Sequence, residues 1–179
     1  IATKEISEVQ LADIYYSFFE VKDIPHQDSI AQRRQSVMDM KYRGDKLMFA
    51  GMSGDNFSAT FKMIAFPFKE HAQSINLEMF HFIHNQYETR SPVNVFDTYQ
   101  DKEETKMLAV YYCSPLVTFN LADYKHGDKV RGETISELWP GASRPLDMLC
   151  YTYKEVDYVL VTLSARGLAL FKLADIVNF

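Results

Sequence analysis

The sequence contains three copies of one unit of apolar segments, and this repeat restricts the fold more than any other feature. The copies run over residues 37–64, 93–123 and 145–175. In each copy three apolar segments are separated by short polar turns. A small residue late in the second segment precedes an aromatic residue in the third by ten or eleven positions; the pairs are Ala50 and Phe61, Ala109 and Phe119, Val161 and Phe171. The regularity predicts three short strands per copy.

Each copy also has room for a fourth strand before the next copy begins. The candidates are Ser74–Ile83 after the first copy and Lys129–Ile135 after the second. A four-stranded antiparallel unit repeated every 40 to 60 residues or so is typical of a β-propeller blade. We therefore predict an all-β fold with blades over residues 37–91, 92–144 and 145–179. A β-sandwich is the alternative, because short strands at similar spacing also fit it.

Residues 1–36 form a separate N-terminal segment. Its apolar residues at positions 11, 14, 15, 18 and 19 have helical spacing, so we expect either a short helix or an incomplete fourth blade. Propellers have about four to eight blades, and three or four leave strand edges and faces uncovered. We therefore expect further blades or another chain to complete the ring.

On these repeats the chain resembles the β-propeller repeat proteins over residues 37–176. It lacks the Gly-His and Trp-Asp signatures of WD-repeat blades and the docking motif of quinoprotein propellers, so the subfamily stays open. The resemblance implies a binding or scaffold module that presents a loop face to a protein partner or small ligand. The alternative that it implies is an oxidoreductase-type propeller with a metal or quinone in its channel. The fold alone does not decide whether the chain is an enzyme.

Composition excludes some classes of partner. The net charge is −5 and Arg33-Arg34 is the only dense basic spot, which argues against a nucleic-acid surface. No apolar run reaches the roughly 18 residues that cross a bilayer, so we expect no membrane span. The chain begins at Ile1 without an initiator Met, which favours a processed or fragment terminus and a secreted or periplasmic protein.

The strongest candidate for ligand chemistry is the segment from Glu78 to Arg90. It holds His81, His84 and Glu88, and His26 is a candidate third histidine for a metal. Histidines three positions apart on a strand point to opposite faces, so they converge only if a loop starts near Ile83. Otherwise one histidine is buried and hydrogen-bonded while the other is exposed.

Two acidic residues recur at similar places in the first strands of their copies, Asp39 in Met-Asp-Met and Asp147 in Leu-Asp-Met. Such acids either bind backbone amides at the inner edge of a blade or surround a cation in the channel. Arg166 is expected in a turn on the rim, where it could contact an anionic ligand. All three residues are candidates for ligand binding.

Cys113 aligns with the turn residues Ser53 and Ser164 of the other copies. We therefore interpret it as a turn residue between two strands and not as a nucleophile, which needs a nearby base. A disulfide to Cys150 is not expected, because Cys150 lies on a first strand and Cys113 beyond a second one. Arg43-Gly44-Asp45 is predicted to be a hairpin turn.

Overall fold

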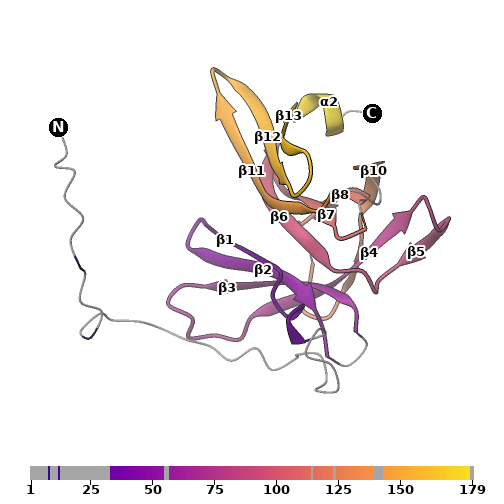
Figure 1. Ribbon diagram of the computed structural model, residues 1–179. Helices are drawn as coiled ribbons and strands as arrows, with labels where there is room; N and C mark the ends of the chain where they lie inside the picture. The colour runs from indigo at the N-terminus through magenta and orange to yellow at the C-terminus, as the bar shows by residue number, and fades with distance from the viewer. Residues whose placement is uncertain are drawn as a thin grey trace.

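The computed structural model describes residues 8, 12, 33–54, 57–113, 115–122, 124–138 and 143–177. Strands dominate these residues, and the helix is a single turn at the C-terminal end (Figure 1). The elements are β1 (Asp39–Arg43), β2 (Lys46–Met52), β3 (Ala59–Ala65), β4 (Gln73–His81), β5 (Gln86–Glu88), β6 (Val93–Asp101), β7 (Glu104–Tyr111), β8 (Pro115–Asn120), β9 (Lys129–Arg131), β10 (Glu133–Glu137), β11 (Pro145–Tyr153), β12 (Val156–Leu163), β13 (Gly167–Lys172) and α2 (Ala174–Val177). The all-β prediction is confirmed.

The strands form three sheets that follow one another along the chain. The first has the order β1-β2-β3-β4-β5, the second β10-β8-β7-β6 and the third β11-β12-β13. Consecutive strands pair antiparallel, as hairpins require. The exception is β9, which leaves the second segment and pairs parallel with β4 of the first sheet. In the part of the chain that the structure describes, no helix is long and apolar enough to span a membrane.

The three sheets meet at β6. This strand contacts β11 of the third sheet and both β1 and β2 of the first, so the first strands of the three sheets lie together (Figure 1). Phe61 and Phe96 meet edge to face between the first two sheets, with ring centroids 5.4 Å apart. Met148 and Val161 of the third sheet are buried in the same core. Each such side chain stabilises the fold by roughly 1.5–3 kcal/mol.

The other face of the third sheet is uncovered by the described residues. Along each strand the side chains point alternately to the two faces of the sheet, so residues two positions apart share a face. Leu149, Leu160 and Leu170 are aligned across the three strands, and Tyr151 stacks on Tyr158 beside them. With Leu168 these side chains are half-buried or exposed. We call this set the open face of the third sheet.

One predicted fourth strand is confirmed, and the other is confirmed only in its second half, where β10 is the fourth strand of the second sheet. Ser74–Ile83 corresponds to β4. Lys129–Ile135 instead divides at Gly132 into β9, which joins the first sheet, and β10, which joins the second. A Cβ at Gly132 would lie 2.5 Å from side-chain atoms of Val117 and Phe119, so only glycine fits where the chain changes sheet. Most of residues 11–19 lie outside the described residues, and the helix there stays a prediction.

The predicted turns are confirmed where they are described. Gly44 and Asp45 have φ values of +54° and +59° between β1 and β2, a conformation that suits a tight hairpin. Cys113 is exposed in the turn between β7 and β8, and Cys150 is buried on β11. Both thiols are free, as expected from their separate positions.

Candidate functional site

One cluster of side chains suited to ligand binding lies where β4 turns into β5. His81 is the last residue of β4, Glu88 is the last residue of β5, and His84 lies in the turn between the strands. Asn85 adopts a φ of +51° and lets this turn close tightly. The turn begins at Phe82, so the loop that convergence of the two histidines requires is present.

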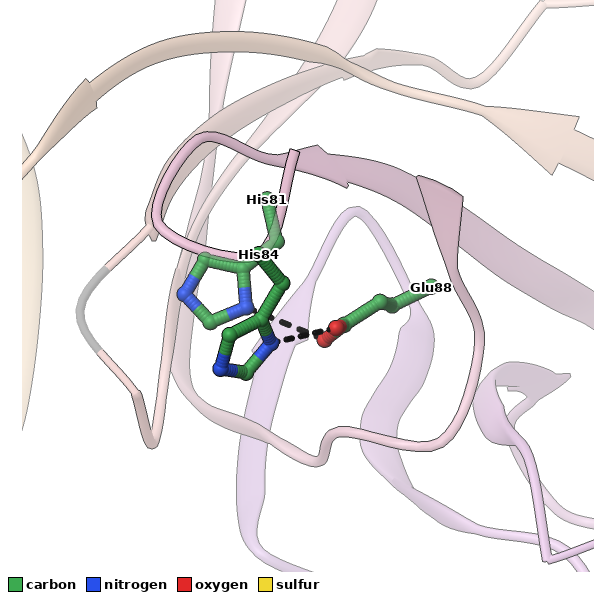
Figure 2. A group of neighbouring side chains, drawn as sticks. All are labelled: His81, His84 and Glu88. Carbon is green, nitrogen blue, oxygen red and sulfur yellow. Dashed lines mark hydrogen bonds and ion pairs between the residues drawn. The ribbon is translucent and has the colours of Figure 1, made fainter. Parts of the chain in front are cut away.

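The three side chains point toward one another (Figure 2). His81 Nδ1 lies 3.0 Å from Glu88 Oε2, and His84 Nδ1 lies 2.5 Å from Glu88 Oε1. The centroids of the two imidazole rings are 4.1 Å apart. His81 is only 1% exposed, whereas the side chain of His84 is 52% exposed. The cluster is therefore anchored in the core at one side and open to solvent at the other.

Glu88 is held as a carboxylate by its neighbours. Burial opposes its ionisation, but hydrogen bonds from Gln86, His81 and His84 outweigh that effect and lower the pKa of Glu88 to about 2. Gln86 donates from Nε2 to Glu88 Oε1 over 3.0 Å. At neutral pH the cluster thus combines one negative charge with two imidazoles.

Glu137 of β10 approaches the cluster from the second sheet. Its Oε1 accepts a hydrogen bond from the Phe82 backbone N–H at 3.2 Å and lies 3.8 Å from His81 Nε2. This buried nitrogen makes no hydrogen bond within the described residues. The sequence pattern did not single out Glu137, because its approach depends on the packing of β10 against the end of β4. Gln86 lies two residues before Glu88 on β5, but its hydrogen bond to that carboxylate is visible only in the structure.

His26, the third histidine predicted for the metal site, lies outside the described residues, so its part in that site stays a prediction. The cluster itself stands at the end of β4, three strands away from β1 in the first sheet. A metal bound by His81 and His84 would therefore be separated from β1, the strand that carries Asp39, by β2 and β3.

A second group consists of one aspartate on each first strand. Asp39, Asp97 and Asp147 make the same local hydrogen bond, in which Oδ1 accepts from the backbone N–H of the following residue at 2.7, 2.8 and 2.8 Å. The three residues are separated by 58 and 50 positions along the chain. They are therefore equivalent positions of the repeat, although Asp97 was not among the predicted site residues.

The second carboxylate oxygen connects one sheet to the next. Asp39 Oδ2 accepts from the Phe96 N–H of β6 at 2.9 Å, and Asp97 Oδ2 accepts from the Cys150 N–H of β11 at 2.8 Å. Asp147 makes no such bond within the described residues, and its side chain is 66% exposed. Asp39 therefore binds backbone amides, which is one of the two roles expected for these acids.

Basic side chains balance these aspartates. Arg43 donates to both oxygens of the fully buried Asp97 carboxylate, from Nε at 3.0 Å and from Nη2 at 2.8 Å. Lys41 Nζ lies 2.7 Å from Asp147 Oδ1 and 3.7 Å from Asp39 Oδ2. The hydrogen bond from Lys41 lowers the pKa of Asp147, whereas burial raises the pKa of Asp39. The cation between Asp39 and Asp147 is thus the ammonium of Lys41.

Arg166 belongs to neither group. It is exposed in the turn between β12 and β13, as predicted, and an anionic ligand there stays a prediction. No family model matched the chain, and neither the curated proteins nor the solved structures that were searched contained a match.

Proposed function

We propose that the chain supplies three consecutive blades of a β-propeller and acts as a binding and scaffold module. The observation that carries the proposal is the repeated aspartate hydrogen bond. Asp39 joins the first sheet to the second and Asp97 joins the second to the third, each through a backbone N–H of the next first strand. Sheets that succeed one another by the same contact are what radial repetition of blades requires.

The repeated aspartate hydrogen bond also indicates what the module binds. Asp147 repeats the local hydrogen bond of its two counterparts and leaves its other oxygen directed at no backbone N–H among the described residues. On the same side of the third sheet lies the open face, with Leu149 and Leu170 exposed. Both features continue the interfaces already present within the chain. The proposed occupant is a further blade, whose first strand donates an N–H to Asp147 and whose apolar side chains cover the open face.

A second copy of this chain is a less suitable occupant of the open face. If its first sheet took the place of the next blade, it would contact the open face with the side of that sheet that faces away from Phe61. Phe49, Thr60 and Lys62 on that side are already buried. The open face is apolar, with Leu149, Leu168 and Leu170 exposed, which suits a protein contact.

Solution measurements on the chain test this proposal. We expect a monomer in light scattering that binds the dye ANS at the open face, with dye binding lost in Leu170→Lys. Met40→Lys is the matched control, because Met40 and Leu170 are each 56% exposed and Met40 lies on β1. A discrete dimer abolished only by Leu170→Lys would assign the face to a second copy and overturn the proposed occupant. If neither the natural chain nor either variant binds ANS, the proposal that the open face receives an apolar partner is refuted.

The oxidoreductase alternative separates into two parts. Its quinone stays a prediction that no described side chain specifically favours. Its metal is favoured by the cluster of His81, His84 and Glu88, whose chemistry can be argued independently of the propeller.

A further inference from the structure

We propose that His81, His84 and Glu88 bind one divalent transition metal ion of the zinc class. The cluster offers two imidazole nitrogens and one carboxylate oxygen, and these ligand atoms lie within 4.8 Å of one another. Two histidines and a glutamate are a frequent ligand set for zinc, and imidazole also suits copper and nickel. Calcium and magnesium are less suitable, because they take oxygen ligands.

The spacing of the ligand atoms fits a metal of this size. Zinc binds imidazole nitrogen and carboxylate oxygen at about 2.0–2.2 Å, so ligand atoms around a tetrahedral ion lie about 3.4 Å apart. His81 Nδ1 lies 3.0 Å from Glu88 Oε2 and His84 Nδ1 lies 2.5 Å from Glu88 Oε1, so each imidazole faces a different oxygen of the carboxylate. An ion bound here would replace both hydrogen bonds, and the side chains would move apart by up to about 1 Å to admit it. His84 is on the exposed side and can make the larger adjustment.

The surroundings resemble the outer shell that metal sites require. A histidine that binds metal through Nδ1 carries its proton on Nε2 and needs an acceptor for it. His81 Nε2 is buried without a hydrogen bond in the described part of the chain, and Glu137 Oε1 is 3.8 Å away. A small shift would let Glu137 accept from this nitrogen, while Gln86 orients the Glu88 carboxylate.

The bound ion would have an open coordination position. Three protein ligands leave the fourth tetrahedral site for water or a small anionic ligand, and the exposed side of His84 gives access to solvent. The ion would also connect the turn after β4 to β5. The inference does not depend on whether the three sheets belong to a propeller.

Zinc titration of the whole chain, freed of metal with a chelator, tests the site. We expect one zinc ion per chain by calorimetry and visible d–d absorption when cobalt is the probe. His84→Gln should lower zinc affinity about 100-fold or more, and Gln86→Ala about tenfold as an outer-shell change. His71→Gln is the control, because His71 is exposed outside the cluster.

Thermal unfolding gives a second measurement that needs no enzymatic assay. Zinc should raise the melting temperature of the natural chain and of His71→Gln, but not that of His84→Gln. Circular dichroism confirms that each variant is folded. Absence of saturable binding, or equal zinc affinity in His84→Gln and His71→Gln, would overturn the metal site and leave a hydrogen-bonded cluster.

Discussion

Replacing Asp97 by Asn should destabilise the chain far more than the same change at Asp147. Asp97 is fully buried and accepts from Cys150, Thr98 and Arg43. Asn has nearly the same shape, but its NH₂ group replaces one of the two acceptor oxygens. A buried backbone N–H or the Arg43 guanidinium then loses its hydrogen-bond acceptor. Hydrogen bonds to charged groups contribute about 1.5–3 kcal/mol each. Breaking a buried ion pair costs about 3–5 kcal/mol, and Arg43 is partly exposed, so we expect a loss of about 3 kcal/mol.

The matched variant Asp147→Asn should cost about 0.5 kcal/mol. Its carboxylate is mostly exposed, and within the described residues it contacts Lys41 and its own backbone neighbour. Asp39→Asn, which loses one bond to Phe96 across the sheets, should lie between the two. Urea unfolding followed by far-ultraviolet circular dichroism measures the difference, provided that a second probe gives the same transition. Equal losses at positions 97 and 147 would refute the idea that this bond joins the sheets.

A double-mutant cycle with Arg43→Met separates the ion pair from the backbone bonds. If the two backbone N–H groups matter by themselves, Asp97→Asn should still cost about 1–3 kcal/mol in the Arg43→Met background. A cost near zero there would assign the whole effect to Arg43. Hydrogen exchange of the Cys150 amide gives an independent local measurement.

Three further predictions concern single side chains. Tyr111→Phe should leave stability unchanged or raise it by about 1 kcal/mol in urea unfolding, because the buried hydroxyl makes no hydrogen bond among the described residues; a loss above that size would contradict this. Hydrogen bonds from Lys129 and Arg131 lower the pKa of Glu78, so its contribution is present above its unfolded pKa of about 4.5 and is lost as pH falls through the folded pKa. Glu78→Gln should therefore flatten the acid limb of a stability-against-pH curve. A thiol reagent should modify one cysteine of the native chain at neutral pH, since Cys113 is exposed while burial raises the pKa of Cys150 to about 12; rapid reaction of both would count against the buried position.

Much of the strand arrangement could be predicted from the repeat, because strands buried on both faces leave apolar runs between polar turns. Two of the three small and aromatic pairs are fully buried in the core, Ala50 with Phe61 and Ala109 with Phe119. In the third pair Val161 is buried and Phe171 is partly buried against the same core. The division at Gly132 could not be predicted. It depends on the space between Val117 and Phe119, which are brought there by the pairing of β8.

The candidate sites, too, could be predicted from the sequence only in part. Local spacing indicated His81, His84 and Glu88, but only the end of β4 at His81 decides that they converge. Asp97 could have been found from the aligned first strands, since it follows Phe96 as Asp39 follows Met38. Its bond to Cys150 could not, because it depends on the stagger between β6 and β11.

The parallel strand β9 has a consequence for the order in which the chain acquires structure. The segment of β4 from Asn76 to Glu78 takes its strand partner from residues 129–131, which follow β6, β7 and β8 along the chain. During synthesis that edge of β4 stays without this partner until the second segment emerges. The two sheets should therefore mature together as one cooperative unit, and a chain cut after residue 91 should expose an incomplete edge that invites aggregation.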